Sequence, residues 1–422
     1  MEKIQSLRGF RDIQGDEARK FARIERVSRR HFELLGYHEI GIPVLEKTEL
    51  FKRSIGDTTD IVEKEMFTFI DRSGESLTLR PEATAGVVRA YLQAGLYAKE
   101  RVSKLFMIGP MFRHERPQKG RFRQFHQVDV EIFGVAEPIV DAEFLWMISL
   151  ILGELGVRNY TFEVNSVGCK GCREEFRKVL IAYLEGKKDL LCEDCTGRVT
   201  RNPLRVFDCK VEQCIALTQG SPLLFDYLCD ECRKHFEQYL EHTGRFGLPV
   251  FVNKRLVRGL DYYTKTVFEV TSSELGAQKA FCAGGRYDNL IHEMGGPAVS
   301  GTGFAIGIER LALLMPEAST ASQPLYFLAT VGDEPASFLV PLLKSFLAEG
   351  LALSYSPSGR SLKSQMKHAD SLGASYALIL GEEEVRKGTI LVRNMKDGSQ
   401  TELPLDVSGL PRAVARLANA KS

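Results

Sequence analysis

Residues 112–127 have the sequence FRHERPQKGRFRQFHQ, a strongly basic loop between two apolar, strand-like segments. From Arg113 to Arg123 there are five Arg or Lys side chains and one Glu. The Pro-Gln-Lys-Gly at residues 117–120 is typical of a turn, so we expect two strands between residues 104 and 134 that project the loop. Guanidinium groups match phosphate geometry and stay charged, so such a loop can hold several phosphates.

The plainer interpretation of this loop is a solvated, charged surface. Against it, Val128-Asp129-Val130-Glu131 alternates apolar and acidic side chains, which predicts a strand anchored in a buried sheet. A second distinctive segment, GTGFAIGIERL at residues 301–311, predicts a glycine-rich strand that leads into a helix ending near Leu314. Taken alone, its glycines indicate only close packing.

The remaining periodicity predicts helices and strands on both sides of these segments. Apolar side chains at helical spacing from Phe21 to Leu35 predict a helix that Gly36 ends. Pro43 lies within the apolar stretch 40–45, so we expect an edge strand or a bulge there. Further expected elements are a strand at residues 77–80, a helix from 82 to 92, strands at 248–252 and 266–270, and mainly helical structure at about 167–244.

The C-terminal part has a different pattern. A small, polar stretch from Ala318 to Pro324 is typical of a linker. Beyond it we expect a compact α/β domain with a mostly parallel sheet, because strands alternate with helices. The expected order is strand 326–331, helix 335–349, strand 351–355, helix 361–372, strand 376–380 and a last strand 389–393 before a turn at Asp397-Gly398.

Length and composition describe a globular protein of two or three domains. The chain has 422 residues, of which 44% are hydrophobic and 26% charged. No apolar run approaches the roughly 20 residues of a membrane helix. The first residues show no signal peptide, so we expect a cytoplasmic protein. The net charge of +1 neither supports nor excludes a nucleic-acid partner, which would have to meet a local basic surface.

Eight of the nine cysteines lie between Cys169 and Cys232, and only Cys282 lies outside. An odd number without a secretory signal argues against a disulfide framework. The eight form four pairs near metal-ligand spacing, so structural zinc is possible. Small buried hydrophobic thiols are the alternative. The most compact quartet is Cys192, Cys195, Cys209 and Cys214, and a second would be Cys169, Cys172, Cys229 and Cys232.

The order of these segments resembles class II aminoacyl-tRNA synthetases. Residues 112–127 resemble their motif 2 and residues 301–311 their motif 3. Two further segments, LVRGLDYY at 256–263 and AGGRYD at 283–288, resemble the histidine-specific signatures of the histidyl-tRNA synthetase family. GFRD at residues 9–12 and TLRPE at 78–82 fit the same family, so that the resemblance covers the whole chain.

The resemblance implies an α+β fold. An antiparallel-sheet catalytic core would span residues 1–166 and 245–317, a helical insertion at 167–244 would close over the tRNA acceptor arm, and an α/β domain at 325–422 would bind the anticodon. It further implies ATP as a substrate with Mg²⁺, L-histidine and tRNA(His) as partners, and a homodimer with the region of Pro43 as a contact. No membrane partner is expected.

The resemblance also implies roles for individual residues. Arg113 would bind the α-phosphate, Arg310 the γ-phosphate and Arg121 the triphosphate between them. Arg258, with Arg113, would be catalytic, because it would lie where the histidine carboxylate meets the α-phosphate. The histidine α-amino group would contact Glu82, Thr84 and Gln127, and the imidazole would contact Glu131, Tyr263 and Tyr287, with Tyr262 beside them.

Some alternatives stay open at this point. Gly259, Leu260 and Tyr262 could chiefly shape the strand that presents Arg258 and Tyr263. No general base is evident. A non-catalytic regulatory paralogue of histidine biosynthesis shares the core, but it usually has degraded histidine signatures and lacks the C-terminal domain. In this chain the signature at residues 258–263 and the C-terminal domain from Pro324 are both intact. A zinc-dependent nucleic-acid-binding module would explain the cysteines and the basic loop only.

Overall fold

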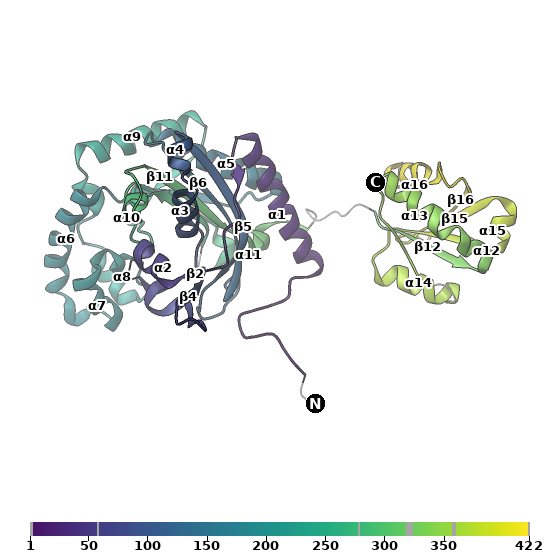
Figure 1. Cartoon of the computed structure of the whole chain (residues 1–422), viewed down its shortest axis with the longest axis horizontal. Coiled ribbons are helices and arrows are strands. Elements are labelled where there is room, and N and C mark those ends of the chain that lie inside the picture. Colours follow the sequence, from purple (N-terminus) through teal and green to yellow (C-terminus); the bar gives the residue numbers. More distant parts are fainter. Residues whose placement is uncertain (1–2, 57–58, 277–278, 318–323, 357–359, 421–422) are drawn as a thin grey trace. The chain divides into compact units, whose positions relative to one another are not determined.

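The computed structural model describes residues 3–56, 59–276, 279–317, 324–356 and 360–420, which form two compact units divided between residues 320 and 321 (Figure 1). Residues 318–323 of the expected linker lie outside the described residues. Among the helices in the described ranges, none is long and apolar enough to cross a membrane.

An eight-stranded sheet forms the centre of the larger unit. Its strands, in order across the sheet, are β1 (His38–Glu39), β5 (Ser103–Phe112), β6 (Gln124–Phe133), β11 (Gly301–Gly307), β10 (Ala280–Arg286), β9 (Thr264–Thr271), β7 (Thr161–Ser166) and β8 (Val250–Val252). Neighbours from β5 to β7 are antiparallel, and only the two edge pairings are parallel. The predicted antiparallel core is therefore confirmed, as is the β5–β6 pair around the basic loop.

Alternation along β6 separates a structural face from a functional one. Val128, Val130 and Ile132 are fully buried in the apolar cluster shared with α1 (Gly15–Leu34), α5 (Ile139–Leu155) and α11 (Ile308–Leu314). The helix α1 forms as its apolar periodicity predicts, with Phe21, Ile24 and Val27 buried. Since adjacent side chains of a strand point to opposite faces, the acidic residues of β6 lie on the other side of the sheet.

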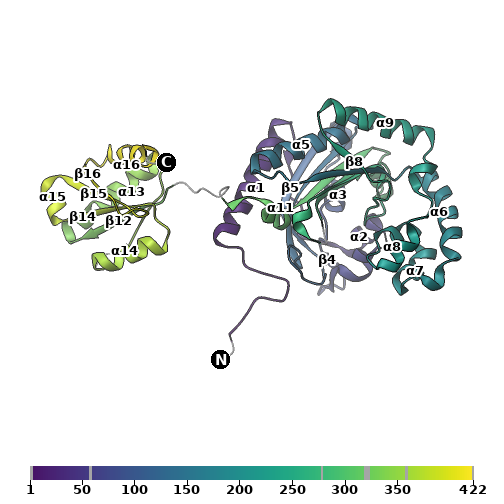
Figure 2. The same ribbon diagram turned by 180° about the vertical axis from the view of Figure 1, so that it is seen from behind.

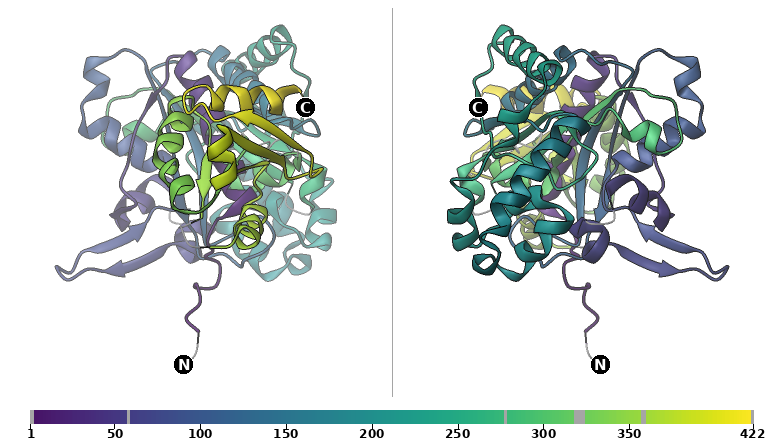
Figure 3. Two further views of the ribbon diagram at one scale, coloured as in Figure 1. Left: turned by 90° about the vertical axis from the view of Figure 1, so that its right-hand side faces the viewer. Right: turned by 90° about the vertical axis from the view of Figure 1, so that its left-hand side faces the viewer.

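Residues 40–44 form no strand, so the expected edge strand is wrong except for β1 before it and β2 (Leu45–Lys47) after it. The reason is a side chain. The buried Arg80 guanidinium donates to the carbonyls of Ile42, at 2.7 Å, and Pro43, at 3.4 Å, and thereby replaces a neighbouring strand. β2 instead joins β4 (Ser76–Leu79) and β3 (Phe67–Ile70) in a small antiparallel sheet whose hairpin projects from the larger unit (Figure 3).

The insertion is helical, as predicted. Its helices are α6 (Lys170–Glu185), α7 (Glu193–Arg201), α8 (Glu212–Thr218) and α9 (Asp230–Arg245), with a 3-10 segment at Pro203–Asp208. Figures 1 and 2 show α6, α7 and α8 grouped at one end of the larger unit, whereas α9 runs back along α5. The face of the sheet opposite α1 is covered by this group and by α3 (Thr84–Gln93).

The smaller unit contains a five-stranded sheet in the order β13 (Leu353–Tyr355), β12 (Tyr326–Val331), β14 (Tyr376–Gly381), β15 (Thr389–Asn394), β16 (Gln400–Pro404). The pairings of β12 are parallel and those of β15 antiparallel, so the expected mostly parallel sheet is only half correct. β15 is not the last strand, because the turn at Asp397-Gly398 returns the chain as β16. Its helices are α12 (Asp333–Ser337), α13 (Leu339–Ala348), α14 (Leu362–Ser371), α15 (Glu382–Lys387) and α16 (Leu410–Ala420).

Candidate active site

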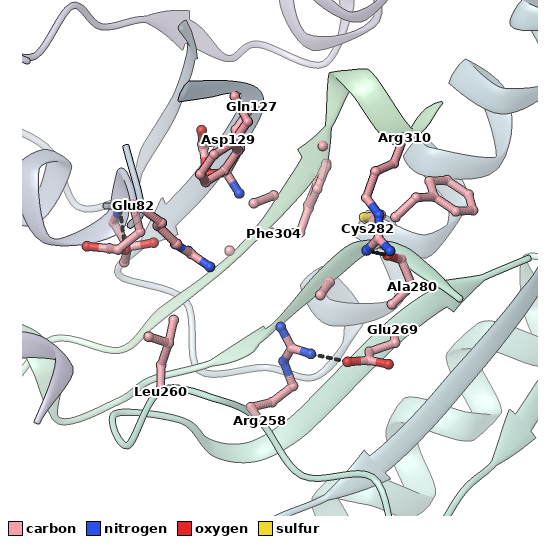
Figure 4. Close-up of a pocket in the computed structure, with 18 of the residues that line it drawn as sticks. Glu82, Gln127, Asp129, Arg258, Leu260, Glu269, Ala280, Cys282, Phe304 and Arg310 are labelled. Carbon is pink, nitrogen blue, oxygen red and sulfur yellow. Dashed lines mark hydrogen bonds and ion pairs between the residues drawn. The ribbon is translucent and has the colours of Figure 1, made fainter. Parts of the chain in front are cut away.

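A cavity of about 270 Å³ opens on the acidic face of β6 (Figure 4). Small-molecule sites commonly enclose roughly 300–1,000 Å³, so the cavity has the size of a small-ligand site. Its walls come from β6, β11, β10, β9, the start of α3, the loop between β5 and β6, the start of α11 and the chain before β9. Of the residues predicted for the site, it is lined by Glu82, Thr84, Arg113, Arg121, Gln127, Arg258, Tyr262, Tyr263, Tyr287 and Arg310, whereas Glu131 is not among the lining residues.

Three buried carboxylates lie together at one end of the cavity: Glu82 and Asp129 line it, and Glu131 contacts Thr84 and Tyr287 of its wall. Glu82 accepts the backbone N–H groups of Thr84 and Ala85, both at 2.9 Å, and so caps α3. Glu131 accepts hydrogen bonds from the Thr84 hydroxyl, at 2.7 Å, and from the Tyr287 phenol. Burial raises the pKa of Glu82 and raises the pKa of Glu131 well above its ordinary value, although both gain hydrogen bonds. A cation in the cavity would relieve this cost.

Asp129 is the third carboxylate and was not among the predicted site residues. It is 3% exposed, and burial and the charge of Glu82 raise its pKa well above the ordinary value. Within the described residues, neither Asp129 Oδ2 nor the Oε1 of Gln127 has a hydrogen-bond partner. The alternation of β6 could have identified Asp129, because it lies between Gln127 and Glu131 on the same face.

The strand opposite β6 leaves space for these groups. Gly303 of β11 pairs with Glu131, and a Cβ atom at Gly303 would overlap the Glu131 carboxylate. The glycine-rich segment therefore has a definite steric role at this position.

Tyrosines form a wall beside the carboxylates. The Tyr262 ring lies 4.7 Å from that of Tyr263 and 5.5 Å from that of Tyr287, centroid to centroid. Tyr263 is 8% exposed and Tyr262 6%, and both line the cavity. Tyr262 therefore packs in the core and also lines the cavity, so that it can do both.

Arg258 lies between the two ends of the cavity and forms an ion pair with Glu269 of β9 (Figure 4). Its Nε has no hydrogen-bond partner in the described part of the chain. Burial lowers the pKa of Arg258, but the charge of Glu269 and neighbouring groups more than compensates, so that the net shift is upward. Arg258 is thus a partly buried, charged group whose Nε–H has no acceptor among the described residues.

The residues 258–263, here called the signature loop, do not form the strand that we expected. Side chains of the insertion bind the backbone of this loop in place of a strand partner. Arg173 donates to the carbonyls of Asp261, at 3.2 Å, and Tyr263, at 2.8 Å. Arg205 donates to the Arg258 carbonyl at 3.2 Å, and the Asn202 amide donates to the Asp261 carboxylate at 2.9 Å.

The opposite end of the cavity is cationic. Arg121 donates to Glu115 at 2.7 Å, and Arg310 of α11 donates to the Ala280 carbonyl. Burial and the charge of Arg121 lower the pKa of Arg310 to about 10. Partial burial and these two arginines also lower the pKa of Lys210, which the insertion contributes. Like charges held this close favour a polyanion between them.

Comparison with known proteins places this arrangement in a family. A histidyl-tRNA synthetase family profile matches residues 9–311, and an anticodon binding domain profile matches residues 329–408. The chain is 46% identical to a histidine–tRNA ligase of Trichlorobacter lovleyi, covering 97% of this chain and 98% of that protein. It is 48% identical to the one of Aquifex aeolicus, covering 95% and 99%. The chain belongs to the histidyl-tRNA synthetase family.

Solved structures agree with this membership. The apo histidyl-tRNA synthetase of S. aureus superposes with a TM-score of 0.79 at 32% identity, covering 97% of this chain and 99% of that one. A Bacillus halodurans protein described as an ATP phosphoribosyltransferase regulatory subunit/histidyl-tRNA synthetase has a TM-score of 0.67 at 20% identity and covers 90% and 99%. That second likeness concerns the fold alone.

Arg286 of the second histidyl-tRNA synthetase signature has a structural role and does not line the cavity. Arg286, 0% exposed, pairs with the buried Asp141 at 3.1 Å and donates to the Val135 carbonyl at 2.8 Å. Thr302 donates to the same Asp141 at 2.7 Å. These contacts fix the end of β10 and thereby the adjacent Tyr287, which reaches Glu131.

Proposed function

We propose that this cavity activates histidine with ATP and that the product, histidyl-adenylate, then acylates tRNA(His). The chain is a histidine–tRNA ligase, a class II aminoacyl-tRNA synthetase, as the whole-length likeness to curated ligases requires. The observation that carries the assignment to this cavity is its division into an acidic, phenol-lined end and an arginine-lined end with Arg258 between them.

The acidic end would hold histidine. The ammonium group would meet Glu82, Thr84 and Gln127, and Asp129 adds a buried carboxylate beside them. The imidazole would lie among Glu131, Tyr263 and Tyr287, with Tyr262 packed against these phenols. Apolar analogues of similar shape would leave these buried polar groups unpaired, which is how such a site discriminates most strongly.

The cationic end would hold the triphosphate of ATP. Arg113 would contact the α-phosphate, Arg121 the chain beyond it and Arg310 the γ-phosphate. Glu115, which pairs with Arg121, and Glu309, which His126 binds, both line the cavity and are the carboxylates that a magnesium ion arriving with ATP would use as oxygen ligands. A histidine carboxylate oxygen attacks the α-phosphorus, the bond to the β-phosphate breaks, and pyrophosphate leaves. Arg258 and Arg113 neutralise the developing charge.

The acyl group then passes to a ribose hydroxyl of tRNA(His), and AMP leaves. For this step we propose that residues 167–244 cover the acceptor arm and that residues 325–422 bind the anticodon. We further propose a cytoplasmic homodimer. Exposed Leu45, two residues after Pro43, and exposed Phe69 and Ile70 of β3 in the same small sheet offer apolar surface for such a contact. Sedimentation of the intact protein would measure its mass.

ATP–pyrophosphate exchange with each amino acid in turn tests the activation step. We expect exchange with histidine alone. An absence of exchange in folded protein would instead favour a regulatory paralogue. Exchange stimulated by another amino acid would refute the assignment of the acidic end.

A further inference from the structure

We propose that the insertion binds two structural zinc ions and that these sites hold the side chains that position the signature loop. The first quartet comprises Cys169, Cys172, Cys229 and Cys232, and the second comprises Cys192, Cys195, Cys209 and Cys214. Within each quartet all sulfur atoms lie within 4.8 Å of one another, although three separate segments contribute to the second and two distant ones to the first.

Local backbone geometry brings the sulfurs of each Cys-x-x-Cys pair together. Cys169, Cys192 and Cys229 are the N-cap residues of α6, α7 and α9, each with an extended backbone, and the second cysteine lies in the first helical turn. Backbone N–H groups also face the sulfurs. Cys229 donates to Cys172 Sγ at 3.2 Å, and Cys192 donates to Cys214 Sγ at 3.3 Å. Such donors stabilise thiolates, the form that binds metal.

The sulfur spacing fits a tetrahedral metal. Zinc–sulfur bonds of about 2.3 Å place two tetrahedral ligands roughly 3.8 Å apart. The Cys169–Cys172 sulfurs are 3.6 Å apart and the Cys192–Cys209 sulfurs 3.8 Å apart. A disulfide needs about 2.05 Å, and all nine cysteines are free thiols.

Simple burial of small apolar thiols explains this arrangement less well. One cysteine of each pair is buried, but Cys169, Cys192 and Cys209 are partly exposed and Cys229 is exposed. Four sulfurs converging from separate segments, half of them reaching solvent, match a thiolate ligand set, and four soft thiolates select zinc among common divalent ions.

Both quartets flank residues that hold the signature loop. Arg173, which binds the Asp261 and Tyr263 carbonyls, follows Cys172 directly. Asn202 and Arg205, which bind Asp261 and the Arg258 carbonyl, lie between Cys195 and Cys209. A metal that fixes the start of α6 or the chain around residues 192–214 therefore fixes these donors.

Metal analysis of the intact protein, purified without chelator, tests the sites themselves. We expect two zinc ions per chain, X-ray absorption showing four sulfur ligands at about 2.3 Å, and cobalt substitution giving the intense visible bands of a tetrahedral thiolate site. Cys282→Ala, which changes the cysteine outside the quartets, should keep both ions. Absence of zinc, or zinc bound by nitrogen or oxygen, would overturn the proposal, and a single ion would overturn the two-site assignment.

Two variants test the positioning role, which rests on the proposed function, whereas the metal count does not. Cys229→Ser with Cys232→Ser should retain one zinc, and Arg173→Ala should retain two. In both we expect kcat/KM for histidine in pyrophosphate exchange to fall roughly tenfold to a hundredfold, the effect of a small misplacement, with the KM for ATP nearly unchanged. If Arg173→Ala has the wild-type kcat/KM for histidine, or if its KM for ATP worsens as much as its kcat/KM for histidine, the proposed positioning of the signature loop is refuted. This outcome does not depend on whether the double cysteine variant folds.

Discussion

Arg258→His tests whether the charge of Arg258 acts mainly on the reacting phosphorus. The Arg258 side chain is 18% exposed, so it lies in partly desolvated surroundings. At an effective dielectric of about 20, a unit charge roughly 4 Å from a phosphoryl oxygen is worth about 4 kcal/mol. Loss of one preorganised donor to a developing oxyanion typically costs about 10²–10³ in kcat. We expect a fall of that size in exchange kcat.

Histidine binding should change much less, because its other proposed contacts are in the acidic end. We expect the Kd for histidine, measured by calorimetry without ATP, to rise less than about tenfold, since an interaction made chiefly in the transition state changes rate more than binding. The substitution also leaves Glu269 without its cation, which should cost roughly 1–3 kcal/mol of stability for a half-buried pair. Exchange is therefore measured well below the Tm of the variant.

Glu269→Gln is the matched control, because it removes the ion pair and keeps the guanidinium. It should lose a similar amount of stability and much less of kcat. Equal losses of kcat and histidine affinity in Arg258→His, or an equally inactive Glu269→Gln, would refute the assigned role.

Two further substitutions test the acidic end. Asp129→Asn should weaken histidine binding roughly tenfold or more by calorimetry, because a charged hydrogen-bond partner is lost. Since burial and Glu82 raise the pKa of Asp129, its carboxyl favours folding at low pH and loses that contribution as pH rises through the raised pKa. The Tm of Asp129→Asn minus the Tm of the wild-type protein should therefore increase from about pH 5 to about pH 8. A decrease of this difference over the same range would contradict the reasoning. Gly303→Ala should displace Glu131 and lower kcat/KM for histidine roughly a hundredfold. The control is Gly153→Ala, at a helical position with open space, which should change neither the kinetics nor the fold. A fully active Gly303→Ala would show that Glu131 has room to move.

The parts of the fold that the sequence predicted are those where local periodicity decides the structure. The alternation of β6 predicted its buried and polar faces, and the apolar spacing of residues 21–35 predicted α1. Two of the wrong predictions, at residues 40–44 and at the signature loop, concern backbone that distant side chains bind. Arg80 binds the carbonyls of Ile42 and Pro43, and Arg173 and Arg205 bind carbonyls of the signature loop. No local pattern in the sequence predicts such contacts.

The predicted site residues depended on resemblance more than on pattern. Spacing alone predicted a basic loop, but it could not bring Arg121 and Arg310 to one cavity from segments nearly two hundred positions apart along the chain. Asp129 shows the opposite case, since its place on β6 was available from alternation and needed no family. The two cysteine quartets were grouped by spacing, and the structure brings together the same two sets.

The opposite charges at the two ends of the cavity give it an internal electric dipole. In the proposed binding mode, a zwitterion with its ammonium toward Glu82 and Asp129 would be aligned with that field, and its carboxylate would lie toward Arg258 and the phosphate of ATP. Histamine, which lacks the carboxylate, would feel only the attraction of the acidic end and would occupy it without approaching Arg258. We therefore expect the field to orient the amino acid head to tail before its ring makes any contact.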